Sequence, residues 1–175
     1  MVHMRLSLAA LLCAAVSITT SLLNAQALSG RRAPSFSLPD SKFTQHDILD
    51  YRGHWLIVDF MKTNCPHCNA LTTTLEEVKT RYGTKLGVLE IVVPPDNLNT
   101  VAKYITETKT TSPVVFDSGQ VAAAYFNITP INQKPFDTPH WFLIDPSGMI
   151  VRDWTQGLAD AKDWVKELDQ LVAKK

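Results

Sequence analysis

The sequence predicts an α/β domain with a central mixed β-sheet flanked by helices on both faces. Short apolar runs rich in branched and aromatic residues, typical of buried strands, alternate with longer segments whose apolar residues recur at helical spacing. The last part of the pattern is a hairpin followed by a helix, which adds antiparallel strands to the sheet. With 175 residues, 45% of them hydrophobic and 19% charged, the chain is long enough for one domain with its own core.

The predicted elements follow in a regular order. After an extended lead-in over residues 28–41 comes a short helix over 45–51. The strands are expected at 55–60, 86–93, 113–116, 141–144 and 149–154, and the further helices at 66–82, 97–108, 119–126 and 158–171. Pro66 suits the first turn of a helix, Gly83 suits the end of one, and 146–148 is a Pro-Ser-Gly turn between the last two strands.

The charge balance argues against two kinds of main partner. Lys plus Arg and Asp plus Glu number 17 each, so the formal net charge is zero. Nucleic acids and anionic membrane surfaces demand clustered positive charge. Neither is therefore expected to be the main partner.

Residues 1–27 have the order of a secretory signal. A positively charged start precedes an apolar run over 6–16, and 25–27 (Ala-Gln-Ala) supplies a small-x-small cleavage site. We therefore expect a cleaved signal peptide, a mature domain over 28–175 and a periplasmic or other extracytoplasmic location. The alternative is a membrane anchor through residues 6–23, which is roughly long enough to span a bilayer.

Cleavage removes Cys13 and leaves Cys65 and Cys68 as the cysteines of the mature chain. Cysteines three residues apart close a ring too small to stabilise a fold, so in an oxidising compartment the pair indicates redox chemistry. The pair lies where a buried strand meets the start of a helix, whose free N–H groups and dipole stabilise a thiolate. Cys65 is predicted to be the attacking thiol and Cys68 the resolving one, with no cofactor beyond their disulfide.

His67 lies between the two cysteines. When protonated it favours the Cys65 thiolate, which stabilises the reduced form and makes the disulfide more oxidising. A Cys-x-x-Cys pair can also be half of a zinc site, but the chain has no second pair and its other mature histidines are scattered, so no metal site is expected. A copper-binding carrier that uses Cys65, Cys68 and a histidine stays open as an alternative function.

The segment 56–60 (Leu-Ile-Val-Asp-Phe), followed five residues later by 65–68 (Cys-Pro-His-Cys), resembles the active-site segment of thioredoxins. The wider chain resembles the exported TlpA/ResA-type branch of the thioredoxin-like superfamily, related to the AhpC/TSA redoxins, with supporting stretches at 33–40, 51–53 and 138–148. The resemblance implies a thioredoxin fold with an inserted strand–helix region before a cis-proline. It also implies a thiol–disulfide oxidoreductase that exchanges disulfides with exported proteins through a Cys65 mixed disulfide.

The resemblance further implies roles for individual residues. Asp59 matches a buried acidic residue that manages protons beneath the resolving cysteine, and burial raises the pKa of such a group. Pro139 matches the cis-proline, which faces the cysteine pair and exposes backbone for a substrate strand, and Thr138 matches a substrate-contact and redox-tuning position. Pro66 and His67 resemble the dipeptide of strongly oxidising disulfide-forming enzymes, whereas the scaffold resembles reductases.

Departures from the family's pattern leave the substrate open. Asn64 replaces a tryptophan before the first cysteine, and the segment 131–137 lengthens the approach to Pro139, where a longer loop alters partner choice. The expected partners are protein thiols or disulfides and a redox partner protein. A peroxiredoxin-like peroxidase is a further alternative because it shares the lead-in over 33–36, but Lys62 stands where that chemistry needs a threonine.

Overall fold

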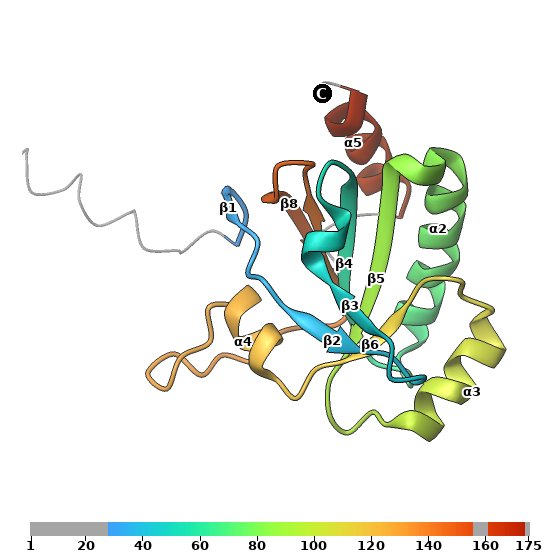
Figure 1. Cartoon of the computed structure of the whole chain (residues 1–175), viewed down its shortest axis with the longest axis vertical. Coiled ribbons are helices and arrows are strands. Elements are labelled where there is room, and N and C mark those ends of the chain that lie inside the picture. Colours follow the sequence, from blue (N-terminus) through green and yellow to red (C-terminus); the bar gives the residue numbers. More distant parts are fainter. Residues whose placement is uncertain (1–27, 156–160, 174–175) are drawn as a thin grey trace, which may run out of the picture.

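The computed structural model of this chain describes residues 28–155 and 161–173. Within these residues, six strands form a mixed sheet with helices on both faces (Figure 1), so the predicted fold class is confirmed. The predicted signal segment lies outside the described residues, as does the start of the predicted helix at 158–171.

The elements agree closely with those predicted. The strands are β1 (Arg31–Arg32), β2 (Ser37–Pro39), β3 (Gln45–Asp47), β4 (Trp55–Met61), β5 (Leu86–Val92), β6 (Val114–Phe116), β7 (His140–Ile144) and β8 (Met149–Thr155). The helices are α2 (Pro66–Tyr82), α3 (Leu98–Thr108), α4 (Gln120–Tyr125) and α5 (Ala161–Ala173), with 3-10 turns at Ile48–Tyr51 and Gly83–Lys85. The strand β6 and the helix α4 form the region expected before Pro139.

The helix predicted over 45–51 is wrong in its first half. Residues Gln45–Asp47 form β3, which pairs antiparallel with β2, and only Ile48–Tyr51 is helical. The side chain of Asp47 accepts a hydrogen bond from the backbone N–H of Leu49 at 2.8 Å. This cap starts the helical turn at Ile48 and leaves the preceding residues free to pair with a strand.

The sheet has the strand order β1-β8-β7-β4-β5-β6. Strands β4, β5 and β6 run parallel, whereas β7 is antiparallel to both β4 and β8. All seven residues of β4 are buried because the strand lies between β5 and β7 and is covered on both faces. The carboxyl end of this central strand leads directly into the start of α2, which is where the predicted cysteine pair lies.

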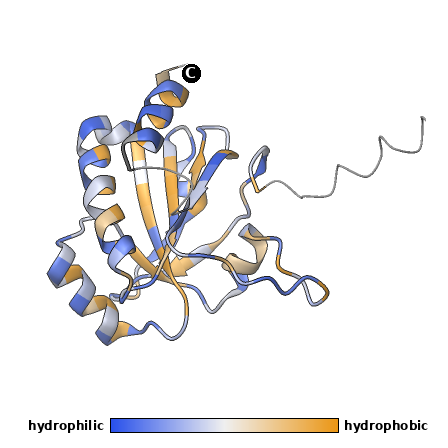
Figure 2. Ribbon diagram, turned by 180° about the vertical axis from the view of Figure 1, so that it is seen from behind, coloured by the Kyte–Doolittle hydropathy of each residue, from blue (hydrophilic) through white to orange (hydrophobic). Residues whose placement is uncertain are grey.

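Alternate residues of β4 point to opposite faces of the sheet. On one face Leu56, Val58 and Phe60 pack in a core that includes Tyr125 of α4. On the other face Ile57 packs in a core shared with α2 and α5. Figure 1 shows α2 and α3 on one side of the sheet and α4 on the other, and Figure 2 shows the central strands as the most hydrophobic part of the chain.

Three tryptophans hold α5 against the sheet. The ring centroid of Trp164 on α5 lies 5.4 Å from that of Trp141 on β7 and 5.8 Å from that of Trp154 on β8. Trp164 is only 1% exposed, and the indole N–H of Trp154 donates to Glu167 at 2.8 Å. Because β7 also carries the residue after Pro139, this packing supports the strand that borders the cysteine pair.

We predict that Trp164→Ala lowers the free energy of unfolding by about 3 to 5 kcal/mol, because it removes a large buried ring and leaves a cavity under α5. Urea unfolding followed by far-ultraviolet circular dichroism measures the change. Lys166→Ala, at an exposed position of the same helix, is the matched control and should change stability by less than about 0.5 kcal/mol. Equal effects of the two substitutions would contradict the role given to the tryptophan cluster.

Candidate active site

The first cysteine of the pair begins helix α2. Cys65 is the N-cap residue with extended backbone, Pro66 occupies the first turn, and the backbone N–H of Cys68 donates to Cys65 Sγ at 3.3 Å. Both cysteines are free thiols; Cys65 is half-buried and Cys68 is 0% exposed. The accessible sulfur thus sits against N–H groups at a helix start, an arrangement that stabilises a thiolate.

A second segment, far away in sequence, meets Cys65. The Thr138–Pro139 peptide bond is cis, and the Cys65 thiol donates to the Thr138 carbonyl oxygen at 3.8 Å. This contact follows from the pairing of β7 with β4, in which His140 lies opposite Phe60. The structure therefore brings Cys65, Thr138 and Pro139 together as the resemblance implied.

Cys68 lies in a different environment from Cys65. Burial raises the pKa of the Cys68 thiol, and its hydrogen bond with Cys65 and the nearby carboxyl of Asp59 add to this effect. Cys68 packs in an apolar cluster with Met61, Val92 and Tyr104. The second thiol is therefore held in its neutral form.

Asp59 lies in the middle of β4 with a relative exposure of 0%. Neither of its carboxyl oxygens has a hydrogen-bond partner among the described residues. Burial raises the pKa of Asp59 well above its ordinary value, and the neighbouring Glu90 and Cys65 raise it further. An acid without donors in an apolar core is held as the protonated form.

Sequence reasoning missed Glu90, the buried acid beside Asp59. The two residues are directly paired in the parallel register of β4 and β5, and Glu90 is also 0% exposed. The available signal was one acidic residue within the apolar run of β5, of the same kind that singled out Asp59.

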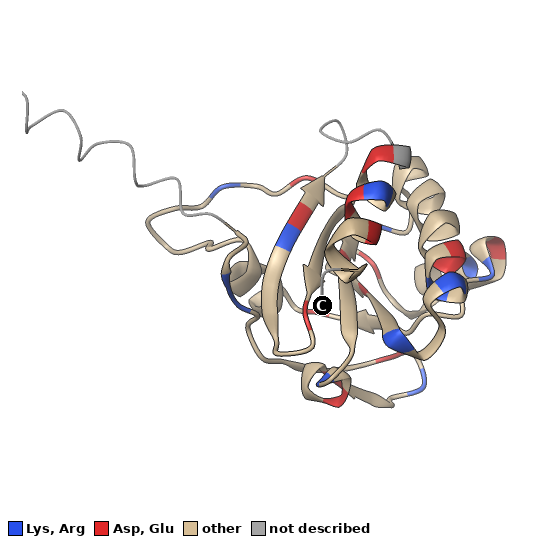
Figure 3. Cartoon of the chain, turned by 90° about the horizontal axis from the view of Figure 1, so that it is seen from above, with Lys and Arg blue, Asp and Glu red and all other residues tan. Residues whose placement is uncertain are grey.

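The remaining predicted site residues lie at the surface of the helix start. Pro66 and His67 are exposed, as are Lys62 and Asn64 in the preceding loop. The backbone N–H of Thr63 donates to Asp96 at 3.1 Å, which ties this loop to the one after β5. Charges of both signs are spread over the helices and loops of the described chain (Figure 3).

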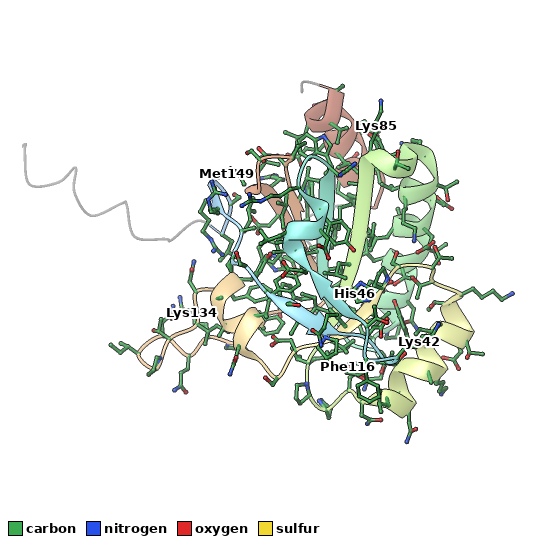
Figure 4. The ribbon with its side chains drawn as sticks, in the orientation of Figure 1. Lys42, His46, Lys85, Phe116, Lys134 and Met149 are labelled. Carbon is green, nitrogen blue, oxygen red and sulfur yellow. The ribbon has the colours of Figure 1, made fainter. Side chains whose placement is uncertain are left out.

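The long segment before Pro139 projects from the domain, and Lys134 marks it in Figure 4. Its base is fixed by Phe136, which stacks on Phe126 with ring centroids 4.1 Å apart. Its tip is open, with Ile131 at 99% exposure. An accessible loop therefore leads up to Pro139, directly before strand β7.

A metal-binding arrangement receives no support from the described residues. Across residues 28–155 and 161–173, no group of three or more His, Cys, Asp or Glu side chains is placed to hold a metal ion. His140, adjacent to Pro139, instead pairs with Asp153 at 3.0 Å. The copper-carrier alternative thus gains no ligand set here.

Solved structures place this fold among the thioredoxin-like proteins. A thiol:disulfide interchange protein of the thioredoxin family from Chlorobium tepidum superposes with a TM-score of 0.68 at 21% identity, covering 80% of this chain and 94% of its own. The chain is therefore thioredoxin-like in fold. Its sequence matches the AhpC/TSA family over residues 29–153, and the chain belongs to that family. The predicted relation to the AhpC/TSA redoxins is confirmed.

Curated relatives agree with this assignment. Thiol-disulfide oxidoreductase ResA from Geobacillus kaustophilus is 29% identical over 122 residues, which are 69% of this chain and 66% of that protein. The match thus spans slightly less than two thirds of that relative's length. The thioredoxin-like protein YneN from Bacillus subtilis is 22% identical over 142 residues, which are 80% of this chain and 78% of that protein.

The part of the chain that the structure describes contains no helix with the length and apolar character needed to cross a membrane.

We predict that Asp59→Asn gains stability relative to the wild type as the pH rises above about 4. Because the pKa of Asp59 is raised in the folded state, the folded protein keeps a proton that the unfolded chain releases above its own pKa. The free energy of unfolding of the wild type therefore falls between the unfolded and folded pKa values. The difference between variant and wild type should grow by up to about 1.4 kcal/mol per pH unit in this window.

Urea unfolding of both proteins between about pH 4 and about pH 8 measures this difference. Asp163→Asn, at an exposed position of α5, is the matched control and should give a difference that barely depends on pH. A pH-independent difference for Asp59→Asn would show that its carboxyl titrates normally in the folded protein.

Proposed function

We propose that this protein is a thiol–disulfide oxidoreductase that exchanges disulfides with other proteins through a mixed disulfide on Cys65. The observation that carries the proposal is the position of Cys65 Sγ, which caps α2 and lies 3.8 Å from the carbonyl oxygen of Thr138. An accessible sulfur at a helix start can attack, and backbone beside it can align an extended substrate. The name of the ResA relative supports the same activity.

The exchange proceeds in two balanced steps. The Cys65 thiolate attacks a substrate disulfide, so that a Cys65–substrate disulfide forms and one substrate thiolate leaves and takes up a proton. Cys68 then loses its proton and attacks Cys65, which forms the Cys65–Cys68 disulfide, and Asp59 manages the proton transfer beneath Cys68. The second substrate sulfur leaves as a thiolate and takes up a proton. The substrate gains two electrons and the pair loses two; the reverse sequence oxidises a dithiol.

The proposal includes the location and the partners of the protein. The order of residues 1–27 supports export followed by cleavage, with the domain over 28–175 acting outside the cytoplasm. Its partners are exported proteins with thiols or disulfides and a redox protein that returns the Cys65–Cys68 pair to its starting redox state. The exposed loop at 131–137, beside Pro139, is the part of the surface best placed to select among them.

We predict that Cys65→Ser abolishes disulfide exchange, whereas Cys68→Ser forms the mixed disulfide and accumulates it. Without Cys65 the described residues offer no accessible thiol, and without Cys68 they offer no second thiol to resolve the intermediate. Reduction of insulin by dithiothreitol, with and without each variant, measures turnover. Non-reducing electrophoresis after mixing with oxidised insulin detects the trapped species. Turnover retained by Cys65→Ser would refute the proposed function.

We also predict that His67→Ala makes the pair more reducing. When protonated, the exposed His67 two residues after Cys65 stabilises the thiolate form, and its removal favours the disulfide. The reduction potential should fall by roughly 30 mV, equivalent to a tenfold change in the equilibrium constant. Equilibration of the Cys65–Cys68 pair with glutathione buffers measures it. His54→Ala, outside the cysteine motif, is the control. Equal reduction potentials in the wild type and both variants would show that His67 does not tune the cysteine pair.

A further inference from the structure

Two buried carboxyl groups lie side by side beneath the cysteine pair. Asp59 on β4 and Glu90 on β5 are register partners, so their side chains leave the sheet on the same face. That face is covered by α2, which carries Cys68, and by α3. Two fully buried carboxyls this close cannot both ionise readily, because like charges in a low dielectric repel strongly.

Hydroxyl groups surround Glu90. The phenol of Tyr104 donates to Glu90 Oε2, and the Thr72 hydroxyl lies 3.3 Å from the same oxygen. The Thr110 hydroxyl lies 2.7 Å from Glu90 Oε1. Since an ionised carboxylate only accepts hydrogen bonds, this shell favours the anionic form of Glu90.

The two acids thus differ in their surroundings. Among the described residues Asp59 receives no hydrogen bond at either oxygen, whereas Glu90 has a partner at both. A single proton shared by such a pair is more stable on the acid without donors. The resting arrangement is therefore a neutral Asp59 beside a negative Glu90.

We propose that Glu90 is a positioning residue of the disulfide-exchange site. Glu90 forms an acid pair with Asp59, and this pair holds a single proton at rest and takes up a second proton from Cys68. The inference rests on the proposed function, since it concerns the step in which Cys68 attacks. It gives a role to a buried acid that the two-cysteine mechanism by itself leaves unused.

The other titratable groups around the acid pair come from α2, its N-cap and α3. Cys65 at the N-cap and Cys68 on α2 lie near Asp59, whereas Glu76 on α2 and Tyr104 on α3 lie near Glu90. Burial raises the pKa of Glu90 and the negative Glu76 adds to this, while the hydroxyl donors act in the opposite direction. The neighbours that carry charge are thus mostly acidic, and they disfavour a second negative charge on Asp59.

The acid pair is connected to the surface. The Thr110 hydroxyl lies between Glu90 Oε1 and Glu76 Oε1, at 2.7 Å and 3.1 Å. Glu76 is partly exposed, and hydrogen bonds from Thr111, Ser112 and Lys79 lower its pKa to about 2. An ionised carboxylate at the surface therefore ends a hydrogen-bonded link through which the pair can return its second proton to water.

The protons and electrons balance in the resolving step. Cys68 sulfur bonds to Cys65 sulfur, the bond between Cys65 and the substrate breaks, and the substrate leaves as a thiolate. The proton of Cys68 passes to the acid pair, which changes from one bound proton to two. It then leaves through Thr110 and Glu76 or follows the departing thiolate.

The test uses the reduced full-length protein and an aromatic disulfide, dithiobis(nitrobenzoic acid), which releases a coloured thiolate in each of two phases. The first phase reports attack by Cys65 and the second reports resolution by Cys68. In Glu90→Gln the only acid left to accept the Cys68 proton is Asp59, which keeps its own proton to higher pH than Glu90 does. The midpoint of the pH profile of the second phase should therefore rise by about one unit, which is about a tenfold slower resolution below the midpoint. The first phase should keep its rate within about twofold.

Glu77→Gln is the matched control, because Glu77 is an exposed glutamate on α2. It should leave both phases and the profile unchanged. A second-phase profile in Glu90→Gln that matches the wild type, or that moves to lower pH, would overturn the proposal. A purely structural role for Glu90 predicts lower stability with an unmoved midpoint, which counts against the proposal as well.

Tyr104→Phe keeps the proposal testable if Glu90→Gln does not fold. Loss of the phenol donor weakens the anionic form of Glu90 and raises the pH at which the pair can accept a proton, so the midpoint should rise by less than in Glu90→Gln. An unmoved midpoint here would also overturn the proposal. Failure of the proposed function can be told apart from failure of this inference. The first would appear as loss of insulin turnover or of the first phase, whereas the second would appear as an unmoved pH profile of the second phase.

Discussion

The hydrogen-bonded pairing of β4 with β7 on one side and β5 on the other fixes the position of each functional group. Pairing with β7 places the Thr138 carbonyl next to Cys65, although 73 residues separate the two in sequence. Pairing with β5 places Glu90 beside Asp59. Because β4 also continues into α2, a single buried strand positions the nucleophile, the backbone it faces and the acids beneath it.

This arrangement buries carboxyl groups in the apolar core, where apolar side chains would be more stable. A carboxyl such as Asp59, with no donor among the described residues, costs folding free energy, and the surrounding core has to offset that cost. The tryptophans that hold α5 and the aromatic packing around Phe60 and Tyr125 provide large apolar burial on opposite faces of the same sheet. The scaffold thus stabilises a site that is itself unfavourable for folding.

The sequence predicted those parts of the structure that depend on local chemistry. The bounds of α2 were correct because Pro66 and Gly83 mark its two ends, and the central strands were found because they are continuous apolar runs. The helix over 45–51 was wrong because the partner of β3 is β2, a pairing that helical spacing does not reveal. Glu90 was missed for a similar reason: its importance depends on register with Asp59 and on hydroxyls from α2, α3 and the following loop.

The two cysteines lie in different electrostatic surroundings, and in the proposed exchange this difference orders the two attacks. Cys65 receives an N–H at the helix start and lies near exposed His67 and Lys62, where a substrate can reach it. Cys68 lies against buried acids that disfavour its thiolate. Under the proposal, attack from Cys68 is held back until a disulfide sulfur is already beside it, and the acid pair below accepts its proton. In this mechanism the buried acid pair and the surface histidine act on the same redox couple, so both, together with the Cys-x-x-Cys motif, set when the pair opens and closes.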